Sequence, residues 1–252
     1  MALGPTLGEW LDEAPFALGM SSGFFSFFAH AGVLSVLEDR GQLPMRVSGS
    51  SAGALVVGTW AAGIDASHLA GELLRLERRD FWDPAPGPGL LRGRRFLERL
   101  EAMLPTRAFD DCRVPLAVSA FDLFTRRTAV LACGPLARAI CASCAVPLLF
   151  QPVWIDGRPY LDGGIADRPG LAGMPAGTRL LFHHIASRSP WRRPTSPALR
   201  IPRRQEMTTL VIHDLPRVHP FALARGQQAF ERARRATRAA LAQPIDGAIL
   251  HA

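Results

Sequence analysis

The sequence predicts an α/β protein with a largely parallel central sheet. The chain has 252 residues, of which 48% are hydrophobic and 20% charged, a balance typical of a globular protein. Two strand–turn–helix units follow one another within residues 16–62, which is the pattern that produces parallel strands. No low-complexity linker divides the chain, so we expect one domain over residues 1–252.

The first unit begins with a short apolar strand at residues 16–19. The strand runs into a turn at residues 20–23 that contains serine and glycine. The stretch FFSFFAHAGVLSVLEDRG then places apolar side chains at helical spacing until Gly41 ends the helix. Parallel strands joined in this way present their turns at one edge of the sheet, so the N–H groups of the first turn can face the second turn.

The second unit carries the most informative motif, in MRVSGSSAGALVVGTWAAG. Ser51 lies in a Gly-x-Ser-x-Gly pentapeptide between a short strand and a helix at residues 52–62. Gly49 and Gly53 allow strand and helix to come close, and the helix N-terminus, beginning at Ala52, points N–H groups at an oxyanion beside the serine. This geometry suits a nucleophile, although a helix-opening turn with a serine cap fits the same pentapeptide.

The rest of the chain continues the α/β pattern. Residues 65–104 have a charged helical pattern, interrupted at residues 83–89 by a Pro/Gly loop that could act as a lid over a site. Asp162 follows a strand end, directly before Gly163 and Gly164. The remaining expected elements are strands at 116–120 and 128–131, a helix at 135–144, a hairpin at 155–161 turning at Asp156-Gly157, strands at 180–185 and 209–212, and an Arg-rich amphipathic helix at 221–241.

The charge of the chain is carried by an unusual set of residues. All 29 basic residues are arginine, and the formal net charge is +7. Such a balance indicates either an anionic partner or a solubilising surface. We expect any peripheral contact with an anionic membrane surface to involve the Arg-rich loop at 188–204 and the helix at 221–241, with a plain solvated face as the alternative. Because the arginines are not interleaved with aromatic residues, nucleic acid is not an expected partner.

Cysteine usage and hydropathy indicate a cytoplasmic protein. The four cysteines do not form a disulfide framework, so we expect reduced thiols, and packing explains the Cys141–Cys144 pair better than redox chemistry. The N-terminal residues lack an apolar segment of signal-peptide length. No run approaches the roughly 20 apolar residues that cross a bilayer, so contact with lipid would be peripheral.

A nucleophilic serine needs a base, and the sequence offers two kinds. An α/β-hydrolase triad would combine Ser51 with Asp162 and either His213 or His219, but that fold places several strands before its nucleophile strand and this chain has one. The second kind is a dyad, in which Asp162 lies in a poorly solvated pocket and accepts the Ser51 proton directly. The other candidate bases are more simply strand-end or helix-packing residues: His30, His183 and His184.

Four segments together resemble the patatin-like phospholipase family: GSSAG, AHAGVLSVLED, ASCAVPLLFQPVWIDGRPYLDGG and LPRVHPFALARG. The resemblance covers about residues 16–226, which we take as the core of the domain. It implies a three-layer α/β/α sandwich, a Ser51/Asp162 dyad, and hydrolysis of acyl esters of lipids without a metal or other cofactor. The oxyanion donors that it implies are backbone N–H groups of Ser22, Gly23, Phe24 and Ala52.

The first turn departs from the family pattern. The family usually has three glycines followed shortly by Arg or Lys, whereas residues 20–26 contain one glycine and no basic residue. Losing one oxyanion donor costs about 10²–10³ in rate in a known serine hydrolase. Two classes of function therefore stay open, a serine acyl hydrolase and a lipid-binding or regulatory protein with weak or lost activity. In either class of function, we expect the phenylalanines near the first turn and residues 148–150 to line an acyl groove or to pack the core.

Overall fold

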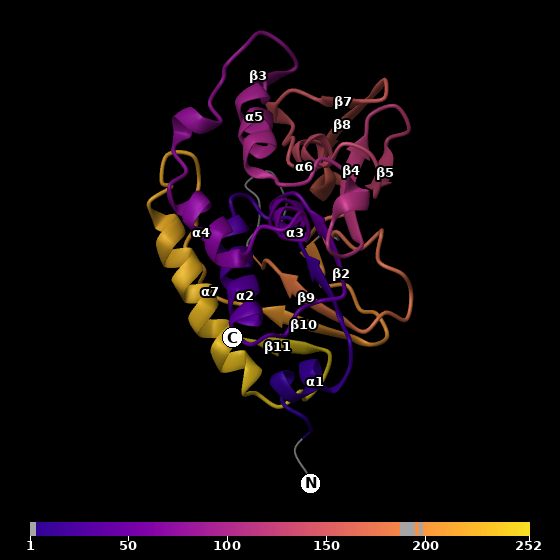
Figure 1. Cartoon of the computed structure of the whole chain (residues 1–252), viewed down its shortest axis with the longest axis vertical. Helices are drawn as coiled ribbons and strands as arrows, with labels where there is room; N and C mark the ends of the chain where they lie inside the picture. Colours follow the sequence, from indigo (N-terminus) through magenta and orange to yellow (C-terminus); the bar gives the residue numbers. More distant parts are fainter. Residues whose placement is uncertain (1–3, 187–194, 197–198) are drawn as a thin grey trace.

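The computed structural model describes residues 4–186, 195–196 and 199–252 (Figure 1). The helices are α1 (Leu7–Glu13), α2 (Phe27–Asp39), α3 (Ala52–Ala61), α4 (Ala66–Leu74), α5 (Arg94–Met103), α6 (Leu136–Ser143) and α7 (Arg225–Leu241), with 3₁₀ turns η1 (Arg78–Asp80), η2 (Phe109–Asp111) and η3 (Gly163–Ile165). The strands are β1 (Ala17–Met20), β2 (Arg46–Ser50), β3 (Gly89–Leu91), β4 (Leu116–Asp122), β5 (Arg127–Leu131), β6 (Leu148–Phe150), β7 (Val153–Ile155), β8 (Arg158–Asp162), β9 (Leu180–His184), β10 (Met207–Val211) and β11 (Ile249–His251).

A mainly parallel sheet lies at the centre of the molecule, in the order β11-β10-β9-β1-β2-β4-β8-β7, with β5 also paired to β4. All neighbours from β11 to β4 are parallel, while β5, β7 and β8 join as antiparallel strands. The predicted α/β fold with a mainly parallel central sheet is thus confirmed. Strands β3 and β6 form a separate two-stranded sheet.

The register of this sheet brings distant turns together. Met20 at the end of β1 is level with Gly49 in β2, so the turns after both strands emerge at one edge. Strand β4 lies between β2 and β8, with Ser119 opposite Ser50 and Ala120 opposite Asp162. The residues after β2 and the end of β8 therefore meet beside the middle of β4.

Both faces of the sheet are covered. Helices α2, α3 and α6 contribute buried apolar side chains to the main core on one face. On the other face a smaller cluster includes Leu171 and Met174, which pack on Phe182 of β9. A Cβ at Gly19 in β1 would overlap Leu171, so glycine allows this segment to lie close to the sheet.

The C-terminal helix α7 lies along α2, as Figure 1 shows. A side chain at Gly32 of α2 would overlap the backbone of Phe230, and one at Gly226 would overlap the ring of Phe28. Arg234 donates to Ser35 Oγ at 2.7 Å. The apolar side of the predicted amphipathic helix is thus buried inside the protein, and the helix begins at residue 225 rather than 221.

Most elements agree with the sequence. The hairpin turning at Asp156-Gly157 is confirmed, as are the adjacent strands β4 and β5. The helix expected from residue 24 begins at 27, because residues 24–26 belong to the turn. The sequence did not indicate α1, β3, β6 or β11, which have three to seven residues each. Most of the Arg-rich loop at 188–204 lies outside the described residues.

No helix in the described part of the chain is long and apolar enough to span a membrane.

Candidate active site

Ser51 occupies the sharp turn between β2 and α3. Its backbone has φ +52° and ψ −120°, a conformation that costs a non-glycine residue about 1–3 kcal/mol. The Ser51 N–H donates to Ser143 Oγ at 2.8 Å, and the Ser143 hydroxyl donates to the Ser119 carbonyl at 2.6 Å. This chain of bonds fixes the turn to α6 and β4.

Glycines allow the turn to form. A Cβ at Gly49 would lie 2.6 Å from the carbonyl carbon of Gly53, so strand and helix meet here without side chains. A Cβ at Gly53 would overlap the carbonyl oxygen of Met20 at the end of β1. The two motif glycines therefore serve the close approach expected from the sequence.

Asp162 lies at the end of β8, facing Ser51. The Ser51 hydroxyl donates to Asp162 Oδ2 at 2.6 Å, and Asp162 Oδ1 accepts from the Gly164 N–H at 2.8 Å. Ser51 is 7% exposed and Asp162 is 6% exposed, so water has little access to the pair. Both carboxylate oxygens are held, which orients one of them at the serine hydroxyl.

Gly163 and Gly164 bring this carboxylate close to its neighbours. A Cβ at Gly163 would overlap the Ser119 carbonyl of β4, and one at Gly164 would overlap the Ser22 hydroxyl of the first turn. The glycines after Asp162 thus allow its loop to lie close to β4 and to the first turn.

The first turn lies beside Ser51, but its backbone N–H groups do not all face the same cavity. Gly23, Phe24 and Ala52 line the same cavity as Ser51. The Ser22 N–H instead donates to the carbonyl of Arg168 at 2.7 Å. Because the Ser22 N–H is already hydrogen-bonded, it differs from the oxyanion donor that was expected at this position. The remaining candidate oxyanion donors are the N–H groups of Gly23, Phe24 and Ala52.

A buried pair of histidines, His30 and His183, is hydrogen-bonded to the backbone of the first turn. His30 Nε2 lies 2.8 Å from the Ser21 carbonyl, which only accepts, so this nitrogen carries a proton. His30 Nδ1 is then an acceptor in the neutral ring, and His183 Nδ1 donates to it at 2.8 Å. Both rings are fully buried, on α2 and β9 respectively. The pair ties the turn after β1 to the neighbouring strand.

Burial keeps these histidines neutral. Burial lowers the pKa of His30 from 6.5 to about 3 and that of His183 well below 6.5. The pKa of His184 falls to about 4, chiefly through burial and secondarily through the nearby positive charge of Arg168. The Arg168 guanidinium donates to the Ile185 carbonyl at 2.6 Å.

His213 and His219, the candidate triad bases, make hydrogen bonds with other residues. His213 Nε2 lies 2.8 Å from Nδ1 of His251, near the C-terminus and exposed. His219 accepts from the N–H of Phe221. No described histidine makes a hydrogen bond to Ser51, whereas Asp162 does. The geometry favours the two-residue arrangement over a triad.

An apolar cavity of about 110 Å³ adjoins Ser51. Side chains of the first turn, α3, α4, α5 and the β6 segment line it, among them Phe24, Leu55, Leu73, Phe96, Leu100, Leu149 and Phe150. Residues 83–89, the expected lid, do not line the cavity. Leu148, expected beside it, is instead 83% exposed.

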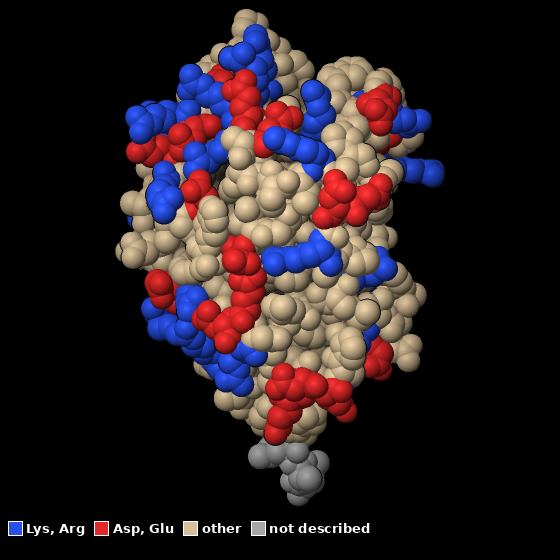
Figure 2. Space-filling view, viewed as in Figure 1, with Lys and Arg blue, Asp and Glu red and all other residues tan. Residues whose placement is uncertain are grey.

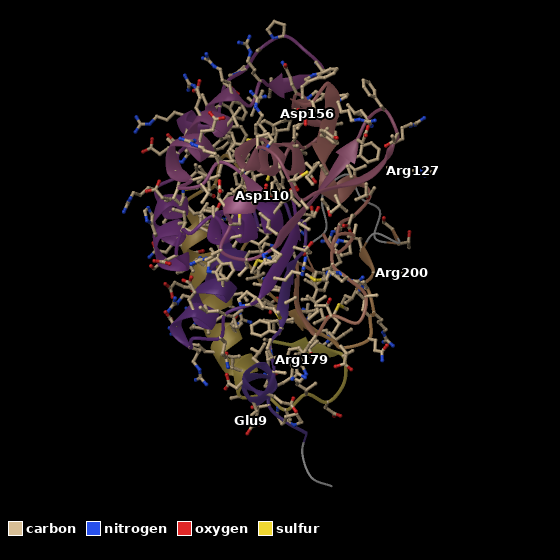
Figure 3. The ribbon with its side chains drawn as sticks, turned by 45° about the vertical axis from the view of Figure 1, so that its right-hand side comes forward. Glu9, Asp110, Arg127, Asp156, Arg179 and Arg200 are labelled. Atoms are coloured by element: carbon tan, nitrogen blue, oxygen red, sulfur yellow. The ribbon has the colours of Figure 1, made fainter. Side chains whose placement is uncertain are left out.

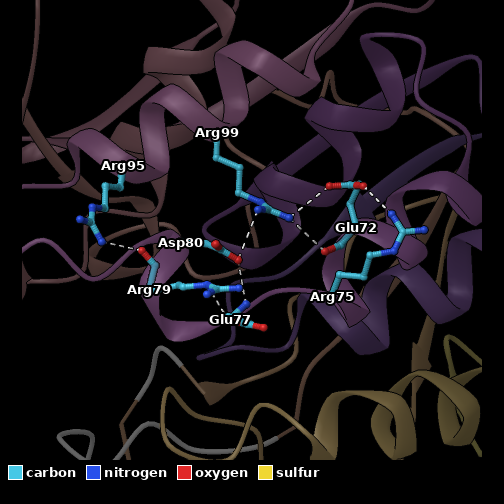
Figure 4. Close-up of polar contacts among 7 residues, drawn as sticks. All are labelled: Glu72, Arg75, Glu77, Arg79, Asp80, Arg95 and Arg99. Carbon is cyan, nitrogen blue, oxygen red and sulfur yellow. Dashed lines mark hydrogen bonds and ion pairs between the residues drawn. The ribbon is translucent and has the colours of Figure 1, made fainter.

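Ion pairs connect the elements that cover this cavity, as Figure 4 shows. Arg99 of α5 contacts Glu72 of α4 at 3.1 Å and Asp80 of η1 at 3.3 Å. Glu72 and Arg99 also line the cavity. The cover is therefore built from α4, η1 and α5.

Two of the four free cysteines lie near the site on α6 and just after it. Cys144 Sγ contacts the Ser51 carbonyl at 3.3 Å. Burial raises the pKa of Cys141 and Cys144, and the Asp162 charge raises that of Cys144 further. Both thiols thus stay protonated and pack in the interior, as expected.

A strained serine, a carboxylate bonded to it and an adjacent apolar cavity together form the candidate site. The profile of the patatin-like phospholipase family matches residues 18–173, which is more than half of the chain. The protein belongs to this family.

Similarity to known proteins agrees with this assignment. Uncharacterized NTE family proteins of Mycobacterium bovis and Mycobacterium tuberculosis are 34% identical over 154 residues, which is 60% of this chain and 43% of each relative. The chain thus matches less than half of the length of these relatives. The fold is similar to that of VipD from Legionella pneumophila, with a TM-score of 0.66 and 14% identity over 90% of this chain and 66% of that one.

Sequence reasoning missed several residues that build the site. Ser143 and Ser119 hold the Ser51 turn, and His30 and His183 hold the first turn. For the two histidines the sequence indicated structural roles, helix packing for His30 and a strand end for His183, but not their contact with each other or with the Ser21 carbonyl. Arg168 gave no signal, because it is one of 29 arginines.

Proposed function

We propose that this protein hydrolyses acyl esters of lipids through a Ser51/Asp162 dyad. The observation that carries the proposal is the 2.6 Å hydrogen bond between the two side chains beside an apolar cavity. Membership of the patatin-like phospholipase family supports a lipid hydrolase. An acyl chain would occupy the cavity, and Asp162, only 6% exposed, would accept the serine proton directly through this hydrogen bond.

The reaction would proceed in two steps. Ser51 Oγ attacks the ester carbonyl carbon and its proton passes to Asp162, while the N–H groups of Gly23, Phe24 and Ala52 stabilise the oxyanion. The C–O bond then breaks, and the alcohol leaves with the proton from Asp162. Water next attacks the acyl-enzyme, gives a proton to Asp162 and releases the fatty acid, after which the proton returns to Ser51.

Covalent labelling tests this proposal. The wild-type protein should react with a fluorophosphonate at Ser51, located by peptide mass spectrometry, and should hydrolyse p-nitrophenyl acyl esters. Ser51→Ala should lose both properties. Ser50→Ala is the matched control, because the neighbouring Ser50 hydroxyl is buried without a hydrogen-bond partner among the described residues. A folded wild-type protein without labelling or turnover would contradict the proposal.

One observation favours the second candidate function, a lipid-binding or regulatory protein with weak or lost activity. The Ser22 N–H donates to the backbone carbonyl of Arg168, so this amide of the first turn is already bonded and does not point at the Ser51 site as a free donor. This candidate predicts that lipid binding survives Ser51→Ala and that the wild-type protein shows no turnover.

A further inference from the structure

Four large apolar side chains are exposed at one end of the molecule. Leu90 of β3 is 50% exposed, Leu148 of β6 83%, Trp154 of β7 56%, and Phe124 of the β4–β5 turn 64%. We call these four residues the rim surface. In Figure 1 strands β3 and β7 and the β4–β5 turn lie at the upper end of the molecule.

Strand pairing and one ring contact connect the segments that carry the rim surface. Strands β3 and β6 pair with Gly89 opposite Leu148 and Leu91 opposite Phe150, so Leu90 and Leu148 belong to adjacent strands. The rings of Phe124 and Trp154 contact each other edge to face at 6.3 Å between centroids. Two residues separate β6 from β7, so the strand that carries Leu148 leads directly into the strand that carries Trp154.

Leu148 is presented outward by an unfavourable backbone. Its φ is +66°, in the left-handed region that costs an L-residue roughly 1–2 kcal/mol. The next two residues, Leu149 and Phe150, point into the cavity beside Ser51. A single short strand thus exposes one leucine to solvent and lines the candidate acyl cavity with its neighbours.

Positive charge lies beside these apolar side chains. Residues 84–97 contain three arginines and no acidic residue, and all three, Arg92, Arg94 and Arg95, are exposed. Figure 2 shows arginines at the upper end of the molecule around α5, with acidic side chains interspersed among them. Glu98 pairs with Arg94 at 3.6 Å. In Figure 3, Asp156 lies at the turn of the β7–β8 hairpin at the same end. Nearby Arg158 pairs with Asp122 of β4 at 2.9 Å.

We propose that the rim surface docks the protein on a bilayer that contains anionic lipids. Leucine, phenylalanine and tryptophan favour the boundary between headgroups and acyl chains, and each arginine near an anionic surface adds roughly 1 kcal/mol. Docking by this surface sets the cavity wall of β6 against the membrane, so that an acyl chain enters without crossing water. The inference rests on the proposed lipid hydrolase and names the surface that meets its substrate.

Vesicle binding by inactive protein tests the surface separately from catalysis. In the Ser51→Ala background, co-sedimentation is measured with phosphatidylcholine vesicles with and without phosphatidylglycerol. We expect binding that requires phosphatidylglycerol and weakens with added salt. Leu148→Ser and Trp154→Ser should each reduce affinity about tenfold, the scale of one large apolar side chain, with thermal unfolding confirming the fold.

The matched controls are Leu43→Ser and Met45→Ser, because these residues are 55% and 59% exposed but precede β2 at the opposite edge of the sheet from Ser51. They should leave vesicle affinity unchanged. Arg92→Glu provides a second test and should lower affinity for anionic vesicles about fivefold or more.

Equal affinity of rim and control variants would overturn the docking surface while leaving hydrolysis intact. The same holds if the Ser51→Ala protein fails to bind vesicles that the wild-type protein hydrolyses, or if the rim variants instead abolish self-association or capture of a protein partner. Absence of esterase activity together with rim-dependent vesicle binding would overturn the proposed hydrolase alone.

Discussion

The buried histidine pair makes the stability of the protein depend on pH in a defined window. His30 faces His183 of β9, with His184 and the cationic Arg168 nearby, and burial lowers the pKa of all three histidines. In the unfolded chain a histidine takes up a proton near pH 6.5, whereas His30 in the folded protein does so near pH 3. The unfolded state therefore binds more protons as the pH falls below 6.5, and folding loses stability.

The size of the effect follows from these two pKa values. Between about pH 7.5 and about pH 5, His30 alone should remove about 2 kcal/mol of unfolding free energy, and His184, with a pKa near 4, a similar amount. The carboxylates with lowered pKa, such as Asp122, lose their contribution at lower pH, so they interfere little above about pH 5. Urea unfolding at several pH values measures the slope.

His30→Gln isolates the contribution of one ring. Glutamine can donate to the Ser21 carbonyl but does not titrate, so the loss of stability toward pH 5 should shrink by about 2 kcal/mol. His68→Gln is the matched control, because His68 is exposed on α4 and should leave the pH slope unchanged. If His30→Gln retains the wild-type slope, the neutral buried pair is not the source of acid sensitivity.

Three further substitutions test the site. Asp162→Asn keeps the shape but removes the base, so ester turnover should fall at least 10²–10³-fold at unchanged Tm, and near wild-type turnover would rule out the dyad. Gly53→Ala should lower Tm by roughly 6–12 °C, because its Cβ overlaps the Met20 carbonyl. Gly71→Ala on α4 should not, because its Cβ would meet only the end of the Arg75 side chain, at an ordinary contact distance of 3.6 Å; equal Tm values would refute the close approach. Ser143→Ala leaves the Ser51 N–H without its acceptor and should cost about 1–3 kcal/mol in urea unfolding, with reduced turnover; an unchanged unfolding curve would show that this bond does not hold the turn.

Local pattern was sufficient for a large part of this protein. Small residues around Ser51, helical spacing after the first turn and the Asp-Gly hairpin each depend on neighbours in sequence, and the structure has the elements that they predict. The order of the motifs along the chain was also sufficient to indicate the family, which the family profile confirms. These features are readable because backbone geometry at a tight turn limits which residue can occupy it.

The tertiary structure decided everything that depends on distant segments meeting. The 2.6 Å contact between Ser51 and Asp162 requires β4 to lie between β2 and β8, an order that no local pattern specifies. Packing between distant segments decides that the Ser22 N–H bonds to the Arg168 carbonyl and that His30 meets His183. A single positive φ angle accompanies the outward position of Leu148. Sequence determined which residues could form the site, and the sheet register determined which of them meet, because hydrogen bonding requires a particular distance and direction that only the assembled fold sets.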